Sequence, residues 1–302
     1  MLGFLKSILY RTPRKVTRAR KPAPPRVEAL EERAVPSYMV MDVPNHGIYL
    51  VDTNPYGHDS GFIANNHADK LAVDSSGDVV ADIPGRGVLA WSNGSGSNRG
   101  WHQLSRWNAT ALAIAGSGGS YNVAVSFQGQ GTYENTGYSS LTQLTSVTAT
   151  MLGIDTSGNI LGEFPRNGVY YHAEYGNWQR VTPYHAHALS YAEGWGVISV
   201  TGHGTYLGQP AQYSWQQIST TTADNVFVDG NGDVLASVNS RPMQIYSSGH
   251  WQNPISGSKW AGMTSDEVGA YFPNQGLYTY NTATGKWTRL LSYTADCFAF
   301  QE

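Results

Sequence analysis

The sequence contains a single cysteine among its 302 residues, few charged residues (14%) and no long apolar run. One cysteine, Cys297, excludes an internal disulfide and a zinc site built on cysteines, and its alternating neighbourhood CFAF predicts a buried structural thiol. No segment reaches the roughly 20 apolar residues of a membrane-crossing helix, and after Ser37 no window has the spacing of an amphipathic helix. Glycine, tyrosine and tryptophan are abundant instead. We therefore expect an all-β protein of short strands and tight turns.

Charge is distributed unevenly along the chain. Residues 1–33 hold nine of the 19 basic residues and three of the 22 acidic ones, so the remainder of the chain is acidic. A nucleic-acid binder needs clustered Lys and Arg for its phosphate contacts. The composition therefore predicts partners other than nucleic acid.

Residues 1–37 differ from the rest in being basic and rich in proline, which predicts a disordered targeting or envelope segment ahead of a single domain, residues 38–302. Their apolar stretches are too short for a membrane span or a usual secretory signal. The phrase RVEALEERAVPS resembles an N-terminal motif of many planctomycete surface and secreted proteins. That resemblance implies an extracytoplasmic location, secreted or attached to the cell envelope. A cytoplasmic protein is the alternative.

Residues 38–302 repeat one pattern with a spacing of 36 to 40 residues. One marker is a large apolar residue near the end of each unit, at Phe62, Trp101, Leu141, Trp178, Trp215, Trp251 and Trp287. A second marker is a short phrase that usually contains glycine and an aromatic, as in HGIYL, RGVLAW and NGVYYH. A third is the turn Asp-x-x-Gly-Asp/Asn between apolar runs, as in LAVDSSGDVVADI, where glycine supplies a positive φ. Each unit thus reads as four short strands.

A period near 40 residues with four strands per unit predicts a β-propeller, in which each unit is one blade. Counting the second marker gives seven blades. The last residues, ADCFAFQE, look like a first strand with nothing after it, and residues 38–65 look like a blade without its first strand. We expect the C-terminal strand to pair with the N-terminal blade and close the ring.

The units resemble tectonin-type repeats, best in LAVDSSGDVVADIPGRGVLAW and GIDTSGNILGEFPRNGVYYH, and the last blade, YNTATGKWTRL, looks similar to a kelch repeat. The resemblance is loose across residues 38–302. It departs from the tectonin pattern where Val80, Leu161 and Leu235 replace an aromatic, and the kelch glycine doublet is missing. The propeller fold is shared by lectins, scaffolds and enzymes, so fold alone does not give function.

Two sets of loops should meet around the axial mouth of such a ring, where a rigid scaffold aims them at a ligand. The loops between second and third strands have polar tips without Asp or Glu, and the segments between blades carry exposed aromatics. The guanidinium, amide and imidazole candidates are Arg86, Arg166, Arg241, Asn45, His46, Gln128, Asn167, His203 and Asn274. The aromatic candidates are Trp107, Tyr184, Trp260 and Tyr293. Two other interpretations stay open: turn tips are polar in most proteins, and a structural role for Trp107 and Trp260 is to wedge between neighbouring blades.

These residue types fit the recognition of a sugar, because pyranose faces stack on aromatic rings and hydroxyls need directed hydrogen bonds. Guanidinium groups would further favour a carboxylated or sulfated glycan. Catalytic signals are weaker, since the tips lack the paired carboxylates of glycosidases, and no catalytic residue is predicted. The Asp-x-x-Gly-Asp turns predict plain hairpins with at most weak calcium binding, and His185 and His187 alone make a poor metal site.

The sequence as a whole predicts a non-catalytic extracytoplasmic binding protein that recognises a glycan or cell-surface polymer at the axial mouth. The alternatives are a platform for protein–protein interaction and a propeller glycoside hydrolase or polysaccharide lyase. No cofactor and no transmembrane span are expected.

Overall fold

The computed structural model describes residues 38–53, 61–94, 99–117, 120–136, 140–238, 242–255, 258, 260–264, 267–273, 275–282, 284–292 and 295–301. The chain divides into residues 1–34 and a compact second unit, Val35–Glu302. The disorder predicted for residues 1–37 lies outside the described residues. Among those described there is no helix long enough to cross a membrane, and the one helical element is a short 3-10 turn, Pro210–Gln212.

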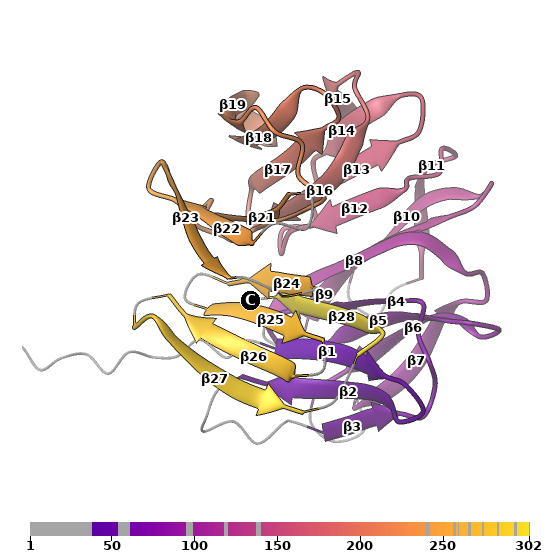
Figure 1. The fold of residues 1–302 in the computed structure, drawn as a ribbon. Helices are drawn as coiled ribbons and strands as arrows, with labels where there is room; N and C mark the ends of the chain where they lie inside the picture. Colours follow the sequence, from indigo (N-terminus) through magenta and orange to yellow (C-terminus); the bar gives the residue numbers. More distant parts are fainter. Residues whose placement is uncertain are drawn as a thin grey trace, which may run out of the picture. The chain divides into compact units, whose positions relative to one another are not determined.

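The second unit consists of seven four-stranded antiparallel sheets, the blades of a propeller (Figure 1). Within each blade we number the strands first to fourth from the axis outward. Blades 1 to 4 are β28 (Cys297–Gln301), β1 (Tyr38–Val43), β2 (Gly47–Asp52), β3 (Gly61–Ala64); β4 (Lys70–Val73), β5 (Val79–Ile83), β6 (Gly87–Ser92), β7 (Gly100–Ser105); β8 (Ala109–Ser117), β9 (Ser120–Phe127), β10 (Gly131–Thr136), β11 (Thr142–Thr145); and β12 (Met151–Ile154), β13 (Ile160–Phe164), β14 (Gly168–His172), β15 (Trp178–Thr182). Blades 5 to 7 are β16 (Ala186–Ala192), β17 (Trp195–Val200), β18 (Gly204–Gln209), β19 (Ser214–Ser219); β20 (Asn225–Val228), β21 (Val234–Ser237), β22 (Met243–Ser247), β23 (His250–Ile255); and β24 (Trp260–Met263), β25 (Glu267–Phe272), β26 (Gly276–Asn281), β27 (Lys286–Leu291).

The predicted closure of the ring is confirmed. The last strand, β28, pairs antiparallel with β1, and its register runs from Tyr38 opposite Gln301 to Asp42 opposite Cys297. The first strands of all seven blades follow one another around the axis, because β28 lies beside both β24 and β4. Seven blades and a single closed ring were both predicted from the repeat.

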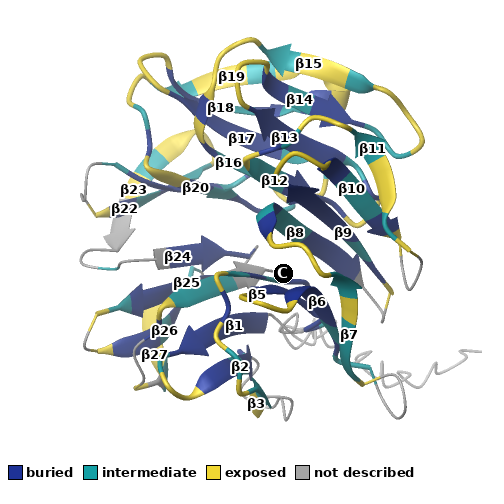
Figure 2. Ribbon diagram, turned by 90° about the vertical axis from the view of Figure 1, so that its right-hand side faces the viewer, coloured by how far each residue is buried: buried dark blue, intermediate teal, exposed yellow. Residues whose placement is uncertain are grey.

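The hydrophobic core lies between the blades rather than within any one of them. Seven clusters of buried side chains each join two neighbouring blades, and the cluster between blades 7 and 1 includes Met39, Met41 and Leu277. The second strands are the most buried, and exposed residues gather on fourth strands and loops (Figure 2). A blade therefore buries its two faces only when both of its neighbours are present.

The glycine of the second sequence marker has a packing reason. Gly87 and Gly131 begin third strands with φ of +82° and +105°, and a Cβ atom there would lie 2.4 and 2.1 Å from a backbone oxygen of the fourth strand. Gly47, Gly168 and Gly204 also have a positive φ and an equally close carbonyl oxygen of the fourth strand. Only glycine permits both this conformation and this approach, so the glycine recurs in these five blades.

The antiparallel order gives the ring two faces with different connections. One face, which we call the interblade face, carries the loops from second to third strands and the segments that lead from one blade to the next. The other, the hairpin face, carries the remaining turns. The arrow of β1 points toward the interblade face in Figure 1, on the right of the view. Both predicted loop sets lie on the interblade face.

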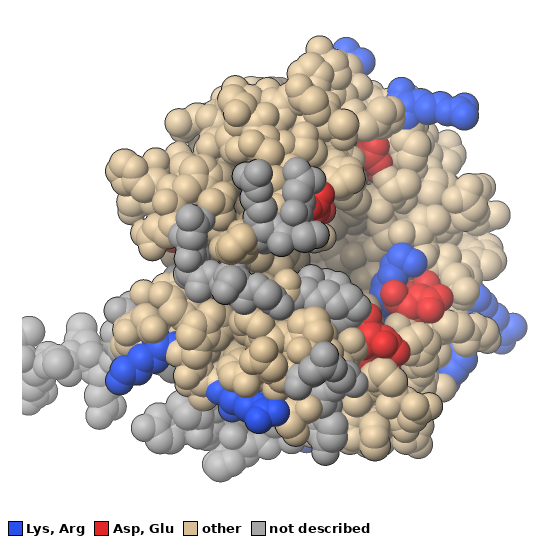
Figure 3. Space-filling model, in the orientation of Figure 1, with Lys and Arg blue, Asp and Glu red and all other residues tan. Residues whose placement is uncertain are grey.

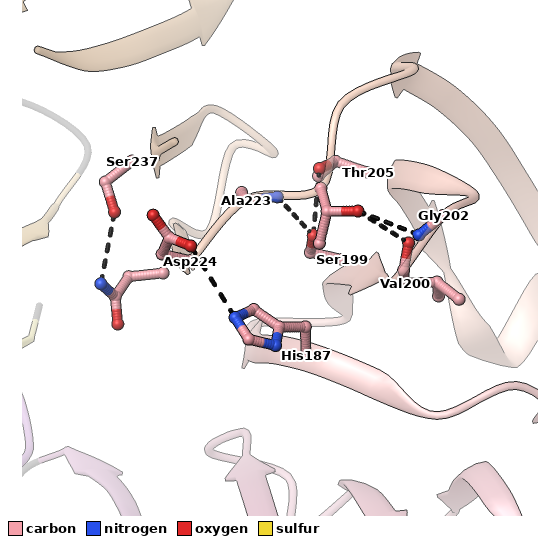
Figure 4. Close-up of polar contacts among 10 residues, drawn as sticks. His187, Ser199, Val200, Gly202, Thr205, Ala223, Asp224 and Ser237 are labelled. Carbon is pink, nitrogen blue, oxygen red and sulfur yellow. Dashed lines mark hydrogen bonds and ion pairs between the residues drawn. The ribbon is translucent and has the colours of Figure 1, made fainter. Parts of the chain in front are cut away.

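Neighbouring blades are tied together on the interblade face by a repeated buried hydrogen bond. The backbone N–H of an alanine just before a first strand donates to a polar side chain near the end of the previous blade's second strand. These interblade hydrogen bonds join Ala68 to Asp42 (3.2 Å), Ala109 to Asp82 (3.1 Å), Ala149 to Ser126 (2.8 Å) and Ala223 to Ser199 (2.7 Å). Figure 4 shows the last of them. The alanine of the sequence segments HADK, NATA, TATM and TADN is thus a blade-joining residue.

Replacing one acceptor tests this role. Ser199→Ala leaves the buried Ala223 N–H without its partner, and we expect the free energy of unfolding to fall by about 1 to 3 kcal/mol. Urea denaturation measures the change. The matched control is Ser146→Ala on an exposed residue of another interblade segment, which should stay within about 0.5 kcal/mol of the parent. Equal effects of the two substitutions would contradict the proposed role.

Candidate functional site

The tips of the loops between second and third strands are built by one repeated turn. The third tip residue donates its backbone N–H to the carbonyl at the end of the second strand, as Arg86 does to Ile83 (2.9 Å) and Asn167 does to Phe164 (3.0 Å). The second tip residue has a positive φ, which is 61° at Asn45 and 70° at Arg166. Because this turn recurs, the third tip residue takes the same place in each blade. These residues are His46, Arg86, Gln130, Asn167, His203 and Gln275.

Several predicted tip and aromatic residues meet at the junctions between blades. The Arg86 Nη1 donates to Asn66 Oδ1 across the junction of blades 1 and 2 (3.0 Å). Tyr184 stacks on His203 across the junction of blades 4 and 5, with ring centroids 4.2 Å apart. Trp107 meets Phe127 edge-on at 5.5 Å. The two aromatics therefore contact the neighbouring blade, yet Trp107 and Tyr184 remain 51% and 52% exposed, so each still offers a ring face.

The structure does not place four of the predicted residues at these junctions between blades. Arg241, Asn274 and Tyr293 lie outside the described residues. Trp260 was expected in a segment between blades, but it is the first residue of β24 and pairs in register with Tyr271. The pattern SKWA matches the other interblade segments in sequence only, because this blade begins its first strand earlier relative to the alanine.

A basic cavity of about 470 Å³ lies at the junction of blades 1 and 2. Its lining residues are Gly85, Arg86, Leu89, Trp101, Gln103 and Arg106. Both arginines are exposed, and none of the described residues that line the cavity is acidic. We call it the arginine pocket. Of its residues, Arg86 alone was predicted from the sequence to bind ligand, and Trp101 was identified as a repeat marker. Arg106 follows the fourth strand, and no sequence pattern distinguishes it.

The arginine pocket has rigid walls. Trp101 donates its indole N–H to the carbonyl of Ile63 in blade 1 (2.9 Å), and its ring packs against Trp91. The Gln103 side-chain amide donates to the Arg86 carbonyl (2.6 Å). The indole and the loop that carries Arg86 are therefore both fixed before any ligand arrives. Such pre-ordering lowers the entropic cost of binding.

Blade 4 has a smaller cavity at the equivalent place, of about 260 Å³. Asn167, Tyr170 and Trp178 stand there where blade 2 has Arg86, Leu89 and Trp101. This cavity is aromatic and uncharged. The fold thus forms a hollow at both junctions, and the tip residue decides its charge. In Figure 3, most of the basic side chains in view lie along the right-hand side, where the interblade face is.

Buried carboxylates on the interblade face are paired with basic side chains. Glu163 is 4% exposed and lies 2.8 Å from His185 Nδ1, and Asp42 pairs with His67 in the equivalent place in blade 1. The His185 Nε2 accepts the backbone N–H of Arg166, so the ring links a tip to a buried acid. At Asp82, burial raises the pKa, and Lys70 at 3.9 Å opposes that shift. These acids stabilise the blade junctions.

Around the axis the structure differs from the predicted arrangement. A cavity of about 540 Å³ is lined by residues of the first strands and of the hairpin-face turns. None of the predicted ligand-binding residues that the structure describes lines it. At the interblade end of the axis, His187 and Asp224 approach to 3.8 Å across blades 5 and 6 (Figure 4). Binding by the predicted residues at the axial mouth therefore stays a prediction.

The Asp-x-x-Gly-Asp/Asn turns are hairpins on the hairpin face, as predicted. Asp155 Oδ1 accepts the backbone N–H groups of Ser157 and Asn159, and its Oδ2 accepts from the Asn159 amide and the Tyr191 hydroxyl. Gly158 supplies the positive φ, 82°. Both carboxylate oxygens of Asp155 therefore accept hydrogen bonds from groups within the protein. Weak calcium binding by such turns is untested.

The corresponding turn of blade 2 contains an unusual acid. Asp74 is fully buried, and its Oδ1 accepts the backbone N–H groups of Ser76 and Asp78. Its Oδ2 has no hydrogen-bond partner. Burial, with the nearby Asp78 carboxylate, raises the pKa of Asp74 to about 7. Because the pKa in the folded protein exceeds the unfolded value, Asp74 costs the fold stability as the pH rises from about 4 to 7.

This predicts a pH-dependent effect of Asp74→Asn. The amide keeps the Oδ1 acceptor and cannot ionise, so at pH 8 the variant should be more stable than the parent by about 1 to 4 kcal/mol. At pH 4 to 5, where Asp74 is protonated, the difference should shrink toward zero. Thermal or urea denaturation across this range measures it, with the exposed Asp69→Asn as control. A gain that does not depend on pH, or a loss at pH 8, would contradict the prediction.

Comparison with known proteins supports the fold. No protein-family model matches the sequence, and no curated protein matches it. Among solved structures, the chain is similar to the computationally designed Ika8 protein (TM-score 0.54, 12% identity, 85% of each chain covered). It is also similar to the Cps50 (Swd1) β-propeller domain of Myceliophteria thermophila (0.55, 11%, covering 80% of this chain and 91% of that one) and to apo AztD from Citrobacter koseri (0.57, 10%, 86% and 83%). The molecule is a seven-bladed β-propeller, a fold compatible with a binding or scaffold role.

Proposed function

We propose that this protein is a non-catalytic binding protein that recognises a carboxylated or sulfated glycan through the arginine pocket. The observation that carries the proposal is the presence of two exposed guanidinium groups, Arg86 and Arg106, in the lining of one cavity with no acidic lining residue. Guanidinium groups bind carboxylate and sulfate oxygens through paired N–H donors. An anionic ligand is the natural complement of this lining.

The rest of the pocket favours a sugar over a small inorganic anion. A volume of about 470 Å³ is large enough for a sugar ring. Trp101 forms one wall, and Gln103 adds an amide. Apolar C–H faces with anionic substituents on the rim are features of uronate and sulfated pyranoses, and such a ring could contact the indole while its charge meets the arginines.

We propose this contact at the arginine pocket of blade 2 rather than at the axial mouth. Both places belong to the interblade face, so a longer polymer bound at the arginine pocket could extend toward the exposed tips of Tyr184 and His203 in later blades. The proposed ligand is therefore a polymer, with one anionic unit held at the arginine pocket.

Substitution of the two arginines tests this function. We expect binding of a defined tetrasaccharide of glucuronate units to weaken by about a factor of 10 or more in Arg86→Ala and in Arg106→Ala, because each loses one guanidinium contact. Arg180→Ala, at an exposed position of β15 outside the pocket, is the matched control and should bind like the parent. Isothermal calorimetry at two salt concentrations measures the affinities, and binding should weaken as salt rises.

The outcomes also separate the alternatives. No binding of uronate or sulfated oligosaccharides by the parent, or an equal loss in the control, counts against the glycan. New reducing ends or unsaturated products during long incubation would favour an enzyme. Recovery of a protein from the cell envelope, lost in Arg86→Ala while oligosaccharides fail to compete, would favour an interaction platform.

The proposed location outside the cytoplasm rests on the phrase RVEALEERAVPS in residues 26–37. We predict that the native protein fractionates with the envelope or the medium. Replacing this phrase by a scrambled sequence should retain it in the cytoplasm, as immunoblotting of cell fractions would show. An unchanged distribution would contradict the assignment of the phrase as an export signal.

A further inference from the structure

The cavity of about 540 Å³ on the propeller axis is a second hollow, open to solvent and separate from the arginine pocket. Residues of all seven first strands contribute to its lining. Each first strand has a paired neighbour on one side only, so its other backbone edge faces the axis. The cavity has the volume of many small-molecule sites in proteins.

Small side chains keep the cavity open. At the middle position of successive first strands the lining has Ala72, Ala113, Gly153, Ser190 and Ala299. Phe227 and Phe298 stand out as large rings in the lining, and both are only partly buried. The walls therefore combine small residues with aromatic rings, and polar side chains such as Ser75 and Thr156 lie among them.

Charge in the lining has one sign. Among the described residues that line the cavity, the carboxylates are Glu193 and Asp229, and there is no Lys, Arg or His. Both lie toward the hairpin face, in the turns that follow β16 and β20. Asp229 is 2% exposed. Two carboxylates at one end of the cavity favour a ligand that brings a positive charge, because a cation there offsets the charge of the buried Asp229 and attracts the exposed carboxylate of Glu193.

The Glu193 carboxylate is held in place by the neighbouring blade. Its Oε2 accepts the Thr156 hydroxyl (2.8 Å), and its Oε1 accepts the Thr156 backbone N–H (3.3 Å). On the other side, Gly230 lies so close that a Cβ atom would be 3.3 Å from the Glu193 Cβ. Thr156 of blade 4 and Gly230 of blade 6 thus lie on either side of Glu193, which belongs to blade 5. The backbone φ of Glu193 is positive, 43°. The Glu193 side chain is exposed, and its hydrogen bonds with Thr156 hold the carboxylate in one place at the end of the cavity.

We infer that the axial cavity is a binding site for an organic cation, a primary ammonium group on a compact apolar body. The ammonium group lies against Glu193, where N–H donors meet a carboxylate that accepts from Thr156. The apolar body fills the space among the small residues and can contact Phe227, whose ring attracts a nearby cation. This site is independent of the proposed glycan function, since it shares no residue with the arginine pocket.

A set of three probes of equal size tests the charge requirement. Cyclohexylmethylammonium, cyclohexanemethanol and cyclohexanecarboxylate differ mainly in charge, and ligand-observed NMR with the full-length protein measures their dissociation constants. We expect the ammonium compound to bind about tenfold more tightly than the alcohol, and the carboxylate to bind least. No binding of the ammonium compound, or equal binding of the ammonium and carboxylate compounds, would overturn the proposal.

Three variants locate the site. Glu193→Gln keeps an oxygen acceptor for Thr156 but removes the charge, and affinity for the ammonium compound should fall about tenfold. Glu174→Gln, on a partly buried acid that does not line the cavity, is the control and should bind like the parent. Ala113→Leu fills the cavity and should abolish binding while the melting temperature reports on folding. If both Glu193→Gln and Ala113→Leu bind normally, the ligand lies elsewhere and the inference is wrong.

Discussion

The fold depends on the fastening of each blade to the next, because the core exists only between blades. The clusters of buried apolar side chains supply most of the burial, while the hydrogen bond from an alanine N–H to a buried Ser or Asp fixes where the next blade begins. The pairing of β28 with β1 completes blade 1, so that it too has a neighbouring blade on each side. Without it, blade 1 would lack its first strand, and the face that blade 7 covers would be exposed to water.

This fastening also determines where side chains can act. At two blades the loop tip meets the segment that leads into its own blade from the preceding one. Arg86 reaches Asn66, and His203 reaches Tyr184. Where the tip is Arg and a second Arg follows the fourth strand, a basic hollow forms; where the tip is Asn and the neighbours are aromatic, the hollow is uncharged. One repeated framework thus presents different chemistry at each junction.

The repeat made the architecture predictable from the sequence, since turn glycines and apolar alternation are local signals that recur along the chain, and the blade divided between the two termini showed how the ring closes. The glycine of the second marker is enforced by a fourth-strand carbonyl, so it had to recur. The site was predicted less well. Arg106 and Arg86 line the same pocket because of how the strands of the blade are arranged, and no spacing in the sequence predicts that the two residues meet. The pairing of Glu163 with His185 and the opening of the axis by Ala113 and Gly153 depend likewise on neighbours in another blade.

The central claim is that recognition occurs at a junction between blades, where two guanidinium groups converge. A crystal structure of the protein soaked with a short uronate oligosaccharide tests it most directly. The account predicts a carboxylate within hydrogen-bond distance of both Arg86 and Arg106, with a sugar ring against Trp101. Electron density for the sugar over the axis, with the arginine pocket empty, would contradict it.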